Sequence, residues 1–272
     1  MTDILTVAVE AAHAGGEVLV SLYQQPRAVD VKTSRADLVT DADRASEAAI
    51  LSSVRRACPD ARVLAEEGGA SGSAEGLRWI IDPLDGTANY AAHIPHWCVS
   101  IGVEDAEGLV VGVVYDPLRE ETFAALRGEG GTLNGRPLEV RDVGALEQAL
   151  LATGFSYEHS QRADHLAGVQ AMVLEARGIR RMGSAALDLA YVACGRMDGF
   201  WERGLRPWDL AAGIVLVREA GGEVSPLEPG TDPLQTGAVV AAGPALHRVL
   251  APRLREIESS EDPGQREQVR AL

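Results

Sequence analysis

The chain has 272 residues, a formal net charge of −15 and 46% hydrophobic residues, so it can bury a large core as one domain or as two lobes. This negative charge repels nucleic acid and anionic lipid, so direct binding to either is not expected. Three cysteines, Cys58, Cys98 and Cys194, fit neither a disulfide framework nor a zinc spacing and are expected to be buried free thiols. Together with the lack of Lys or Arg before Arg27 and of any apolar run near about 18 residues, they predict a cytoplasmic protein without a signal peptide or membrane span.

The first part of the chain predicts two helices followed by a mostly antiparallel sheet. Apolar residues at alternating steps of four and three predict a helix over residues 4–22, with one face formed by Ile4, Ala8, Ala11, Gly15, Val18 and Leu22. Polar residues 24–36 predict a loop or hairpin, and a second helix is expected from Thr40 to about Ala57, before Pro59. Strands are expected at residues 62–65, 77–81, 98–104, 109–115 and 121–126, and Asn134–Gly135 predicts a tight turn.

The second part of the chain alternates short strands with helices, which is typical of an α/β arrangement. Strands are expected at residues 149–152, 199–202 and 238–242, and helices at 161–176, 184–195, 208–220 and 245–257. This change predicts a first lobe of residues 1–145, mixed in helix and strand, and an α/β lobe of residues 146–258. The polar residues 259–272 are expected to form a flexible tail.

Acidic residues gather where predicted strands end or predicted helices begin, which is where open α/β proteins place their sites. The segments are Asp37–Asp43, Glu66–Glu67, Asp82–Asp85 and Asp209. Pro83 and Gly86 turn the chain, so Asp82 and Asp85 can face one point together with the freed carbonyl of Leu84. Oxygen ligands of this kind suit Mg²⁺, which keeps several waters and binds a few carboxylates together with substrate phosphate.

Each acidic segment also has a purely structural explanation. Asp209 can cap a helix, and Thr40 with Asp43 fits a capping box. Glu66–Glu67 can be a solvated turn, and Asp82–Asp85 can be a loop with turn chemistry. Because these segments lie at predicted strand ends or helix starts, a metal site formed by all of them is favoured. Such a site is compatible with helix capping by the same residues. Ser184 lacks the second glycine of a nucleophile elbow, so a serine hydrolase is rejected.

The segments WIIDPLDGTANY and PWDLAAG resemble the paired signatures of the inositol monophosphatase family. The resemblance extends to DLVTDAD, LAEEGG, residues 181–189 and Glu202, and so spans about Lys32 to Glu223. It implies a mixed α and β fold, the layered αβαβα sandwich of the sugar phosphatases. It is specific for the family and much less so for the substrate, because members also hydrolyse histidinol phosphate, fructose bisphosphate and nucleotide 3′-phosphates.

The resemblance also implies roles for individual residues. The metal ligands would be Glu66, Asp82, the Leu84 carbonyl, Asp85 and Asp209, with Asp82 bridging two ions and Glu66 helping to hold a third, weaker one through water. The catalytic residues would be Thr87, which orients the attacking water, Asp43 behind it, and Glu66. The substrate would contact Asp85, the Gly86 and Thr87 amides, Ala185, Glu202 and Asp209, with Lys32 approaching the phosphate.

The function implied is a Mg²⁺-dependent, lithium-sensitive phosphomonoesterase that hydrolyses inositol monophosphate to inositol and phosphate by metal-activated water, with two to three Mg²⁺ per subunit of a homodimer. Two alternatives stay open: a histidinol-phosphate or other sugar or polyol phosphatase, and a regulatory relative that acts through transcription partners. The full metal-ligand set favours catalysis. The net charge of −15 argues against direct RNA binding but not against protein partners.

Overall fold

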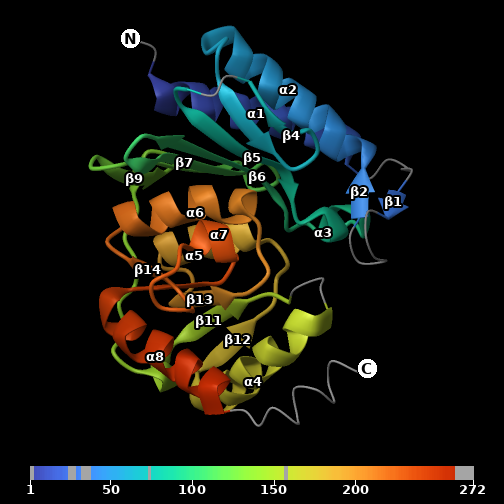
Figure 1. Ribbon diagram of the computed structural model, residues 1–272. Coiled ribbons are helices and arrows are strands. Elements are labelled where there is room, and N and C mark those ends of the chain that lie inside the picture. Colours follow the sequence, from blue (N-terminus) through green and yellow to red (C-terminus); the bar gives the residue numbers. More distant parts are fainter. Residues whose placement is uncertain (1–2, 24–28, 32–37, 73–74, 156–158, 261–272) are drawn as a thin grey trace.

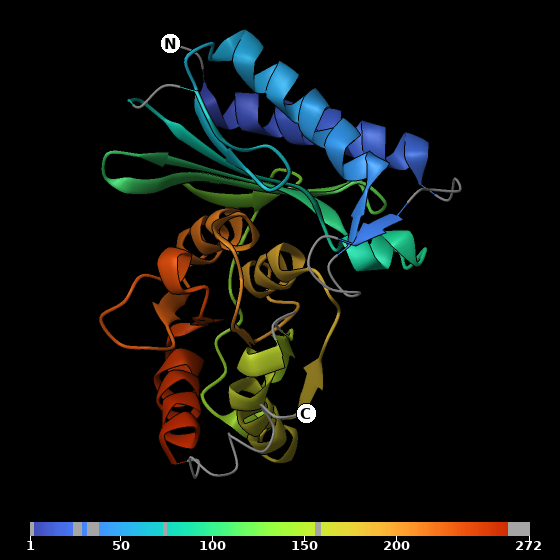
Figure 2. The same cartoon turned by 45° about the vertical axis from the view of Figure 1, so that its right-hand side comes forward.

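The computed structural model describes residues 3–23, 29–31, 38–72, 75–155 and 159–260, which form alternating layers of helices and sheets (Figures 1 and 2). Outer helices α1 (Ile4–Leu22) and α2 (Asp41–Ala57) cover one sheet. Helices α5 (Ala185–Ala193) and α6 (Pro207–Glu219) lie between this sheet and a second one. Helices α4 (His159–Glu175) and α8 (Pro244–Ser260) form the last layer. The expected αβαβα sandwich is therefore confirmed.

The first sheet is mostly antiparallel, as predicted, with one parallel pair between β3 and β5. In spatial order its strands are β10 (Arg136–Pro137), β9 (Gly130–Leu133), β8 (Glu121–Leu126), β7 (Gly108–Asp116), β6 (Cys98–Asp105), β5 (Arg78–Asp85), β3 (Arg62–Ala65) and β4 (Gly69–Ser71). The sequence predicted that the strand before Asp82 ends at Ile81. The structure instead continues β5 through Pro83 to Asp85, with an irregular register between Asp82 and Asp85.

The second sheet combines three parallel strands with an antiparallel edge, which gives the predicted α/β character. Its order is β12 (Gly178–Arg180), β11 (Leu150–Thr153), β13 (Gly199–Glu202), β15 (Val239–Ala242) and β14 (Glu223–Pro226). The remaining elements are the antiparallel hairpin of β1 (Val29–Val31) and β2 (Leu38–Thr40), α3 (Thr87–Ala91), η1 (Leu146–Gln148) and α7 (Pro233–Thr236). Strands β4, β9, β10, β12 and β14 and the three short helices were not predicted.

Two glycines let α6 pack directly on the first sheet. A Cβ on Gly102 of β6 would lie 2.5 Å from the Cβ of Ala211, and one on Gly112 of β7 would lie 2.3 Å from the Ala212 carbonyl. Such distances exclude any larger residue without a shift of the helix. The Ser100 hydroxyl of β6 also donates to the Trp208 carbonyl at 3.1 Å. These contacts hold the first turn of α6 over the middle of the sheet.

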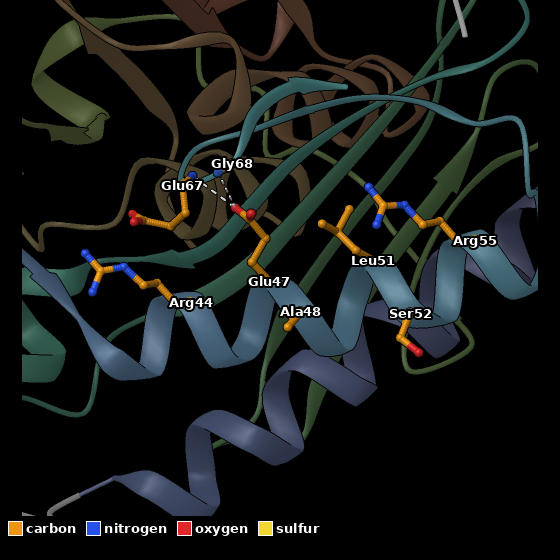
Figure 3. Close-up of a pocket in the computed structure, with 8 residues that line it drawn as sticks. All are labelled: Arg44, Glu47, Ala48, Leu51, Ser52, Arg55, Glu67 and Gly68. Carbon is orange, nitrogen blue, oxygen red and sulfur yellow. Dashed lines mark hydrogen bonds between the residues drawn. The ribbon is translucent and has the colours of Figure 1, made fainter. Parts of the chain in front are cut away.

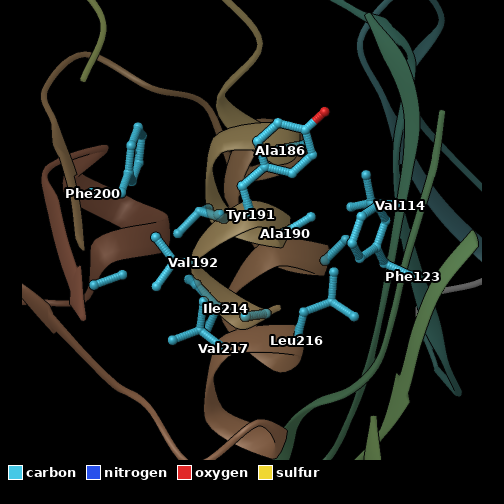
Figure 4. Close-up of a cluster of buried hydrophobic side chains, with 14 of the residues drawn as sticks. Val114, Phe123, Ala186, Ala190, Tyr191, Val192, Phe200, Ile214, Leu216 and Val217 are labelled. Atoms are coloured by element: carbon cyan, nitrogen blue, oxygen red, sulfur yellow. The ribbon is translucent and has the colours of Figure 1, made fainter. Parts of the chain in front are cut away.

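The core between the two sheets is formed largely by α5 and α6 (Figure 4). Figure 4 shows Ala186, Ala190 and Ile214 from these helices packed between Phe200 of β13 and Phe123 of β8. This core is continuous from one sheet to the other, so the position of α5 and α6 is fixed on both faces.

Helix α1 is long and apolar enough to cross a membrane by length and composition, which corrects the expectation that no apolar run comes near about 18 residues. Its buried residues pack against α2 and β7, as in the core helix of a globular fold. Those residues are Val7, Ala8, Ala11, Ala12, Gly15, Gly16 and Leu19. The predicted face is therefore correct at its centre, whereas Ile4, Val18 and Leu22 at its ends are only partly buried.

All three cysteines are free, as predicted, but only Cys98 is buried. Cys58 and Cys194 are partly exposed, which corrects the expectation of three buried thiols. Both lie close to helix ends, Cys58 directly after α2 and Cys194 directly after α5, where packing is less complete.

Candidate active site

Three carboxylates meet where β5 and α6 approach each other. Oxygen atoms of Asp82, Asp85 and Asp209 lie within 4.8 Å of one another. Asp82 and Asp85 come from the irregular end of β5, and Asp209 comes from the first turn of α6. Asp82 and Asp85 are buried. Two of the four acidic segments that the sequence predicted to share one site, Asp82–Asp85 and Asp209, are therefore adjacent in space.

Each carboxylate is held by a donor that leaves other oxygen positions free for a ligand. Asp82 Oδ1 accepts the amide of Leu84 at 2.9 Å. Asp85 Oδ2 accepts the Ser184 hydroxyl at 2.6 Å and the Ala186 amide at 2.7 Å. These bonds keep the carboxylates in one orientation, as outer partners do for metal ligands.

Asp209 lies where both explanations from the sequence can hold. Its Oδ2 accepts the amide of Arg206 at 2.6 Å, so Asp209 completes a capping box from inside the first turn of α6, whereas the N-cap residue itself is Arg206. It is also one of the three clustered carboxylates. The capping explanation and the metal-site explanation are compatible here.

The electrostatics of this cluster suit a divalent cation. Burial raises the pKa of Asp82 well above its usual range, and the charges of Glu66, Asp85 and Asp209 raise it further. Burial and the charge of Asp85 raise the pKa of Asp209 to about 8. Buried carboxylates all carry negative charge and repel one another, and a bound cation offsets this repulsion. An oxygen-only donor set of this density fits Mg²⁺.

Glu66 lies beside this cluster and not within it. The residue follows β3, and its amide donates to the Ile81 carbonyl of β5 at 3.2 Å, which continues the parallel pairing up to Asp82. The charge of Glu66 raises the pKa of both Asp82 and Asp209. Glu66 is therefore close enough to act on the same ion site from one side.

Thr87 begins α3 and contacts the buried Asp43 of α2. Its hydroxyl lies 3.1 Å from Asp43 Oδ1 and 3.1 Å from the Leu84 carbonyl, and its one proton serves one acceptor at a time. Gly86 before it has φ 98°, and a Cβ there would lie 3.0 Å from the His96 carbonyl. Only glycine combines this backbone conformation with so close a neighbour.

Four of the predicted substrate residues line one cavity of about 80 Å³ beside the carboxylates, whereas Gly86 and Thr87 are not among its lining residues. Asp85, Ala185, Glu202 and Asp209 all border it. Lys32, Asp37 and the side chain of Thr40 are not among the described parts of the chain, so their predicted roles have no structural counterpart here.

The sequence model of the inositol monophosphatase family matches residues 1–259. The chain belongs to the inositol monophosphatase family. A protein of Synechocystis named inositol-1-monophosphatase is 45% identical over 252 residues, which are 92% of this chain and 88% of that protein. Nus factor SuhB of Salmonella typhimurium is 43% identical over 259 residues, which are 94% of this chain and 97% of the relative.

Solved structures of the family share the whole architecture. The extragenic suppressor protein SuhB of Bartonella henselae has a TM-score of 0.89 at 39% identity, covering 93% of this chain and 98% of that one. The sugar phosphatase fold expected from the signatures is thereby established. The names of these relatives include both inositol-1-monophosphatase and Nus factor SuhB, so membership of the family alone does not assign the function of this chain.

Four residues of the site were not predicted from the sequence, although three of them lie within residues 181–189, which carry part of the family resemblance. Ser184 holds Asp85, and Arg181 and Asp188 line the cavity. Asp188 is buried, and its Oδ1 has no hydrogen-bond partner among the residues described. A Cβ on Gly154 would lie 2.1 Å from Glu202 Oε1, so this glycine makes room for the Glu202 carboxylate. These roles depend on contacts between distant segments, which spacing does not reveal.

Proposed function

We propose that this protein is a Mg²⁺-dependent phosphomonoesterase that hydrolyses inositol monophosphate to inositol and phosphate. The observation that supports it most is the group of Asp82, Asp85 and Asp209, with oxygens within 4.8 Å of one another, beside a cavity that Glu202 also lines. Phosphate monoesters resist attack because their charge repels nucleophiles, and a metal-lined site offsets this repulsion. A covalent nucleophile is not required.

Glu66, Asp82, the Leu84 carbonyl, Asp85 and Asp209 would hold two to three Mg²⁺ ions, with Asp82 bridging two of them. Bound there, Mg²⁺ supplies Lewis acidity and lowers the pKa of a coordinated water. The Thr87 hydroxyl donates to Asp43, so its oxygen can accept a hydrogen bond from the attacking water, and the proton lost by that water would pass through the hydroxyl to the Asp43 carboxylate. The Gly86 and Thr87 amides hold the phosphate oxygens.

The alcohol half of the substrate would occupy the cavity beside the carboxylates. Glu202 and Asp209 offer carboxylate oxygens, and Ala185 offers its backbone, to the hydroxyls of a polyol. A polyol can donate a hydrogen bond from each hydroxyl, and four carboxylates, those of Asp85, Asp188, Glu202 and Asp209, border the cavity as acceptors. Polyol monophosphates are therefore preferred over nucleotides, with histidinol phosphate and other sugar phosphates as alternative substrates.

A second function is supported by the relatives named Nus factor SuhB, which match nearly the whole chain. In that role the protein would act through transcription proteins, since its charge of −15 disfavours direct contact with RNA. The proposal for this chain is that catalysis is retained, since the metal-ligand set is complete. We also propose that the enzyme is a homodimer, that it is cytoplasmic and that lithium inhibits it.

The experiment is a phosphate-release screen with magnesium across inositol, histidinol, fructose and nucleotide phosphates, run beside a pull-down of transcription proteins. The highest specificity constant is expected for an inositol monophosphate. A much higher constant for a nucleotide 3′-phosphate would reverse the substrate assignment. Partner capture without any phosphate release would support the regulatory function instead.

A further inference from the structure

One face of α2 contacts three separate segments of the candidate active site. Asp43, Ser46 and Glu47 are spaced so that a helix places them side by side. All three are buried although they are polar. Asp43 meets the Thr87 hydroxyl, as described above. Ser46 and Glu47 meet the two segments that carry the carboxylates Glu66, Asp82 and Asp85, and the proposed catalytic roles do not use them.

Glu47 holds the turn that follows Glu66 (Figure 3). Its Oε2 accepts the amide of Glu67 at 3.0 Å and that of Gly68 at 3.3 Å. Glu47 is 6% exposed, although Glu67 and Gly68 line an open pocket together with it. Hydrogen bonds to an ionised acceptor are stronger than neutral ones. Glu66 directly precedes the two captured amides, so its backbone is fixed on one side by Glu47 and on the other by Ile81.

The lack of a side chain at Gly68 permits this contact. A Cβ on Gly68 would lie 2.7 Å from Glu47 Oε1, which is closer than carbon and oxygen approach without a shift. The turn therefore reaches the Glu47 carboxylate because Gly68 has no side chain. Figure 3 shows Glu47 pointing from α2 to this turn, with Arg44 and Arg55 on either side of it.

Ser46 holds the second segment, the irregular end of β5. Its hydroxyl donates to the Pro83 carbonyl at 2.9 Å, and the side chain is fully buried. Pro83 lies in the part of β5 where the register with β6 shifts, between Asp82 and Asp85. A carbonyl in such a bulge loses its sheet partner and needs another donor. Ser46 supplies it and thereby fixes the spacing of the two aspartates.

We infer that Ser46 and Glu47 are positioning residues that set the geometry of the metal ligands from α2, and this rests on the proposed metal site. Glu47 places Glu66, and Ser46 places Asp82 and Asp85. A helix packed on α1 and on the first sheet moves less than turns do, so it is a suitable template for ligands on separate segments. Neither residue coordinates the ion itself.

The test measures binding of Mg²⁺ to the chelator-treated protein by calorimetry, which does not depend on turnover. Glu47→Ala is expected to weaken Mg²⁺ binding about 10- to 100-fold, the usual range for loss of an outer partner of a metal site. Glu47→Gln keeps an amide oxygen that can accept the same two bonds, so it should retain most of the affinity. Ser46→Ala should weaken binding in the same direction as Glu47→Ala.

Val54→Ala on the same helix is the matched control for destabilisation, because Val54 is buried in the core away from the site. It should lower the melting temperature without changing Mg²⁺ affinity. Gly68→Ala probes the contact from the other side and should weaken Mg²⁺ binding in the wild-type background. In a Glu47→Ala background it should add little, since the oxygen it would strike is gone.

Wild-type affinity in Glu47→Ala, with a melting temperature lowered as in Val54→Ala, would overturn the inference. If Glu47→Ala does not fold, weaker Mg²⁺ binding in Gly68→Ala and Ser46→Ala, with most of the affinity kept in Glu47→Gln, still supports a positioning role. Wild-type affinity in both Gly68→Ala and Ser46→Ala refutes it. A wild-type protein that binds Mg²⁺ but releases no phosphate would contradict the proposed function and leave the positioning measurement intact.

Discussion

Ser184 Oγ donates to Asp85 Oδ2 at 2.6 Å and joins two segments 99 residues apart in the sequence. Asp85 ends β5 of the first sheet, and Ser184 precedes α5, which packs between the sheets. The bond opposes the effect of burial, which raises the pKa of Asp85. The bond thus favours the charged form of Asp85, a proposed metal ligand, and holds the carboxylate in one orientation.

Ser184→Ala should weaken Mg²⁺ activation by about 10- to 100-fold at neutral pH. Loss of the hydroxyl raises the pKa of Asp85 further, so less of the carboxylate is available to a cation, and affinity should recover as the pH is raised. The measurement is a Mg²⁺ titration of the rate at several pH values. Ser21→Ala at an exposed position of α1 is the control. A pH-independent loss would show that Ser184 acts only through packing.

Gly154→Ala should impair substrate binding while leaving metal binding unchanged. The new Cβ would lie 2.1 Å from Glu202 Oε1, so the carboxylate must move away from the cavity. A displacement of this size is expected to lower kcat/KM about 100-fold, mainly through KM. Gly144→Ala is the matched control, because a Cβ there meets nothing within 4 Å. An unchanged KM would remove Glu202 from the substrate site.

Thr87→Ala should separate water activation from metal binding. The variant loses the hydroxyl that meets Asp43, so the rate should fall about 100-fold or more, while Mg²⁺ affinity stays close to wild type. Asp43→Asn should behave similarly, and Thr87→Ser should retain most of the rate. If Asp43→Asn melts earlier but turns over normally, Asp43 is only a structural residue of α2.

The chelated protein should lose stability as the pH rises. Asp209 has an ordinary pKa of 3.8 that the folded site raises to about 8. A carboxyl group whose pKa is higher in the folded state than in the unfolded state stabilises the folded state. This stabilisation is complete at a pH below the unfolded-state pKa and is lost as the pH rises through the folded-state pKa. The melting temperature in excess chelator should therefore decrease as the pH rises from 3.8 to about 8. Mg²⁺ should restore it at the upper end, and Asp209→Asn should flatten the dependence. A pH-independent melting temperature in chelator would contradict this electrostatic account.

Much of the architecture could be predicted because it depends on local patterns. Apolar periodicity located α1, a helix stop at Pro59 bounded α2, and acids at a strand end and a helix start placed Asp82, Asp85 and Asp209 together. Short edge strands such as β4 and β12 have too few residues to show a pattern. The division into two lobes at residue 145 stays a prediction.

The supporting residues of the site could not be predicted in the same way. Ser46 and Glu47 resemble ordinary polar residues of an exposed helix until the turns that they hold are folded against them. Pro83 signals the end of a strand locally, yet β5 continues through it because Ser46 pairs with its carbonyl. Such contacts join distant segments, so only the folded chain shows them.

The most direct test of the central claim is phosphate release from inositol 1-phosphate by wild-type and Asp82→Asn protein, titrated with Mg²⁺ after treatment with a chelator. The wild type is expected to show no turnover in chelator and full recovery with Mg²⁺. Asp82→Asn removes a charge from the proposed bridging ligand, so it is expected to show weaker Mg²⁺ activation together with a lower maximal rate. Full turnover in excess chelator, or a wild-type response to Mg²⁺ in Asp82→Asn, would contradict it.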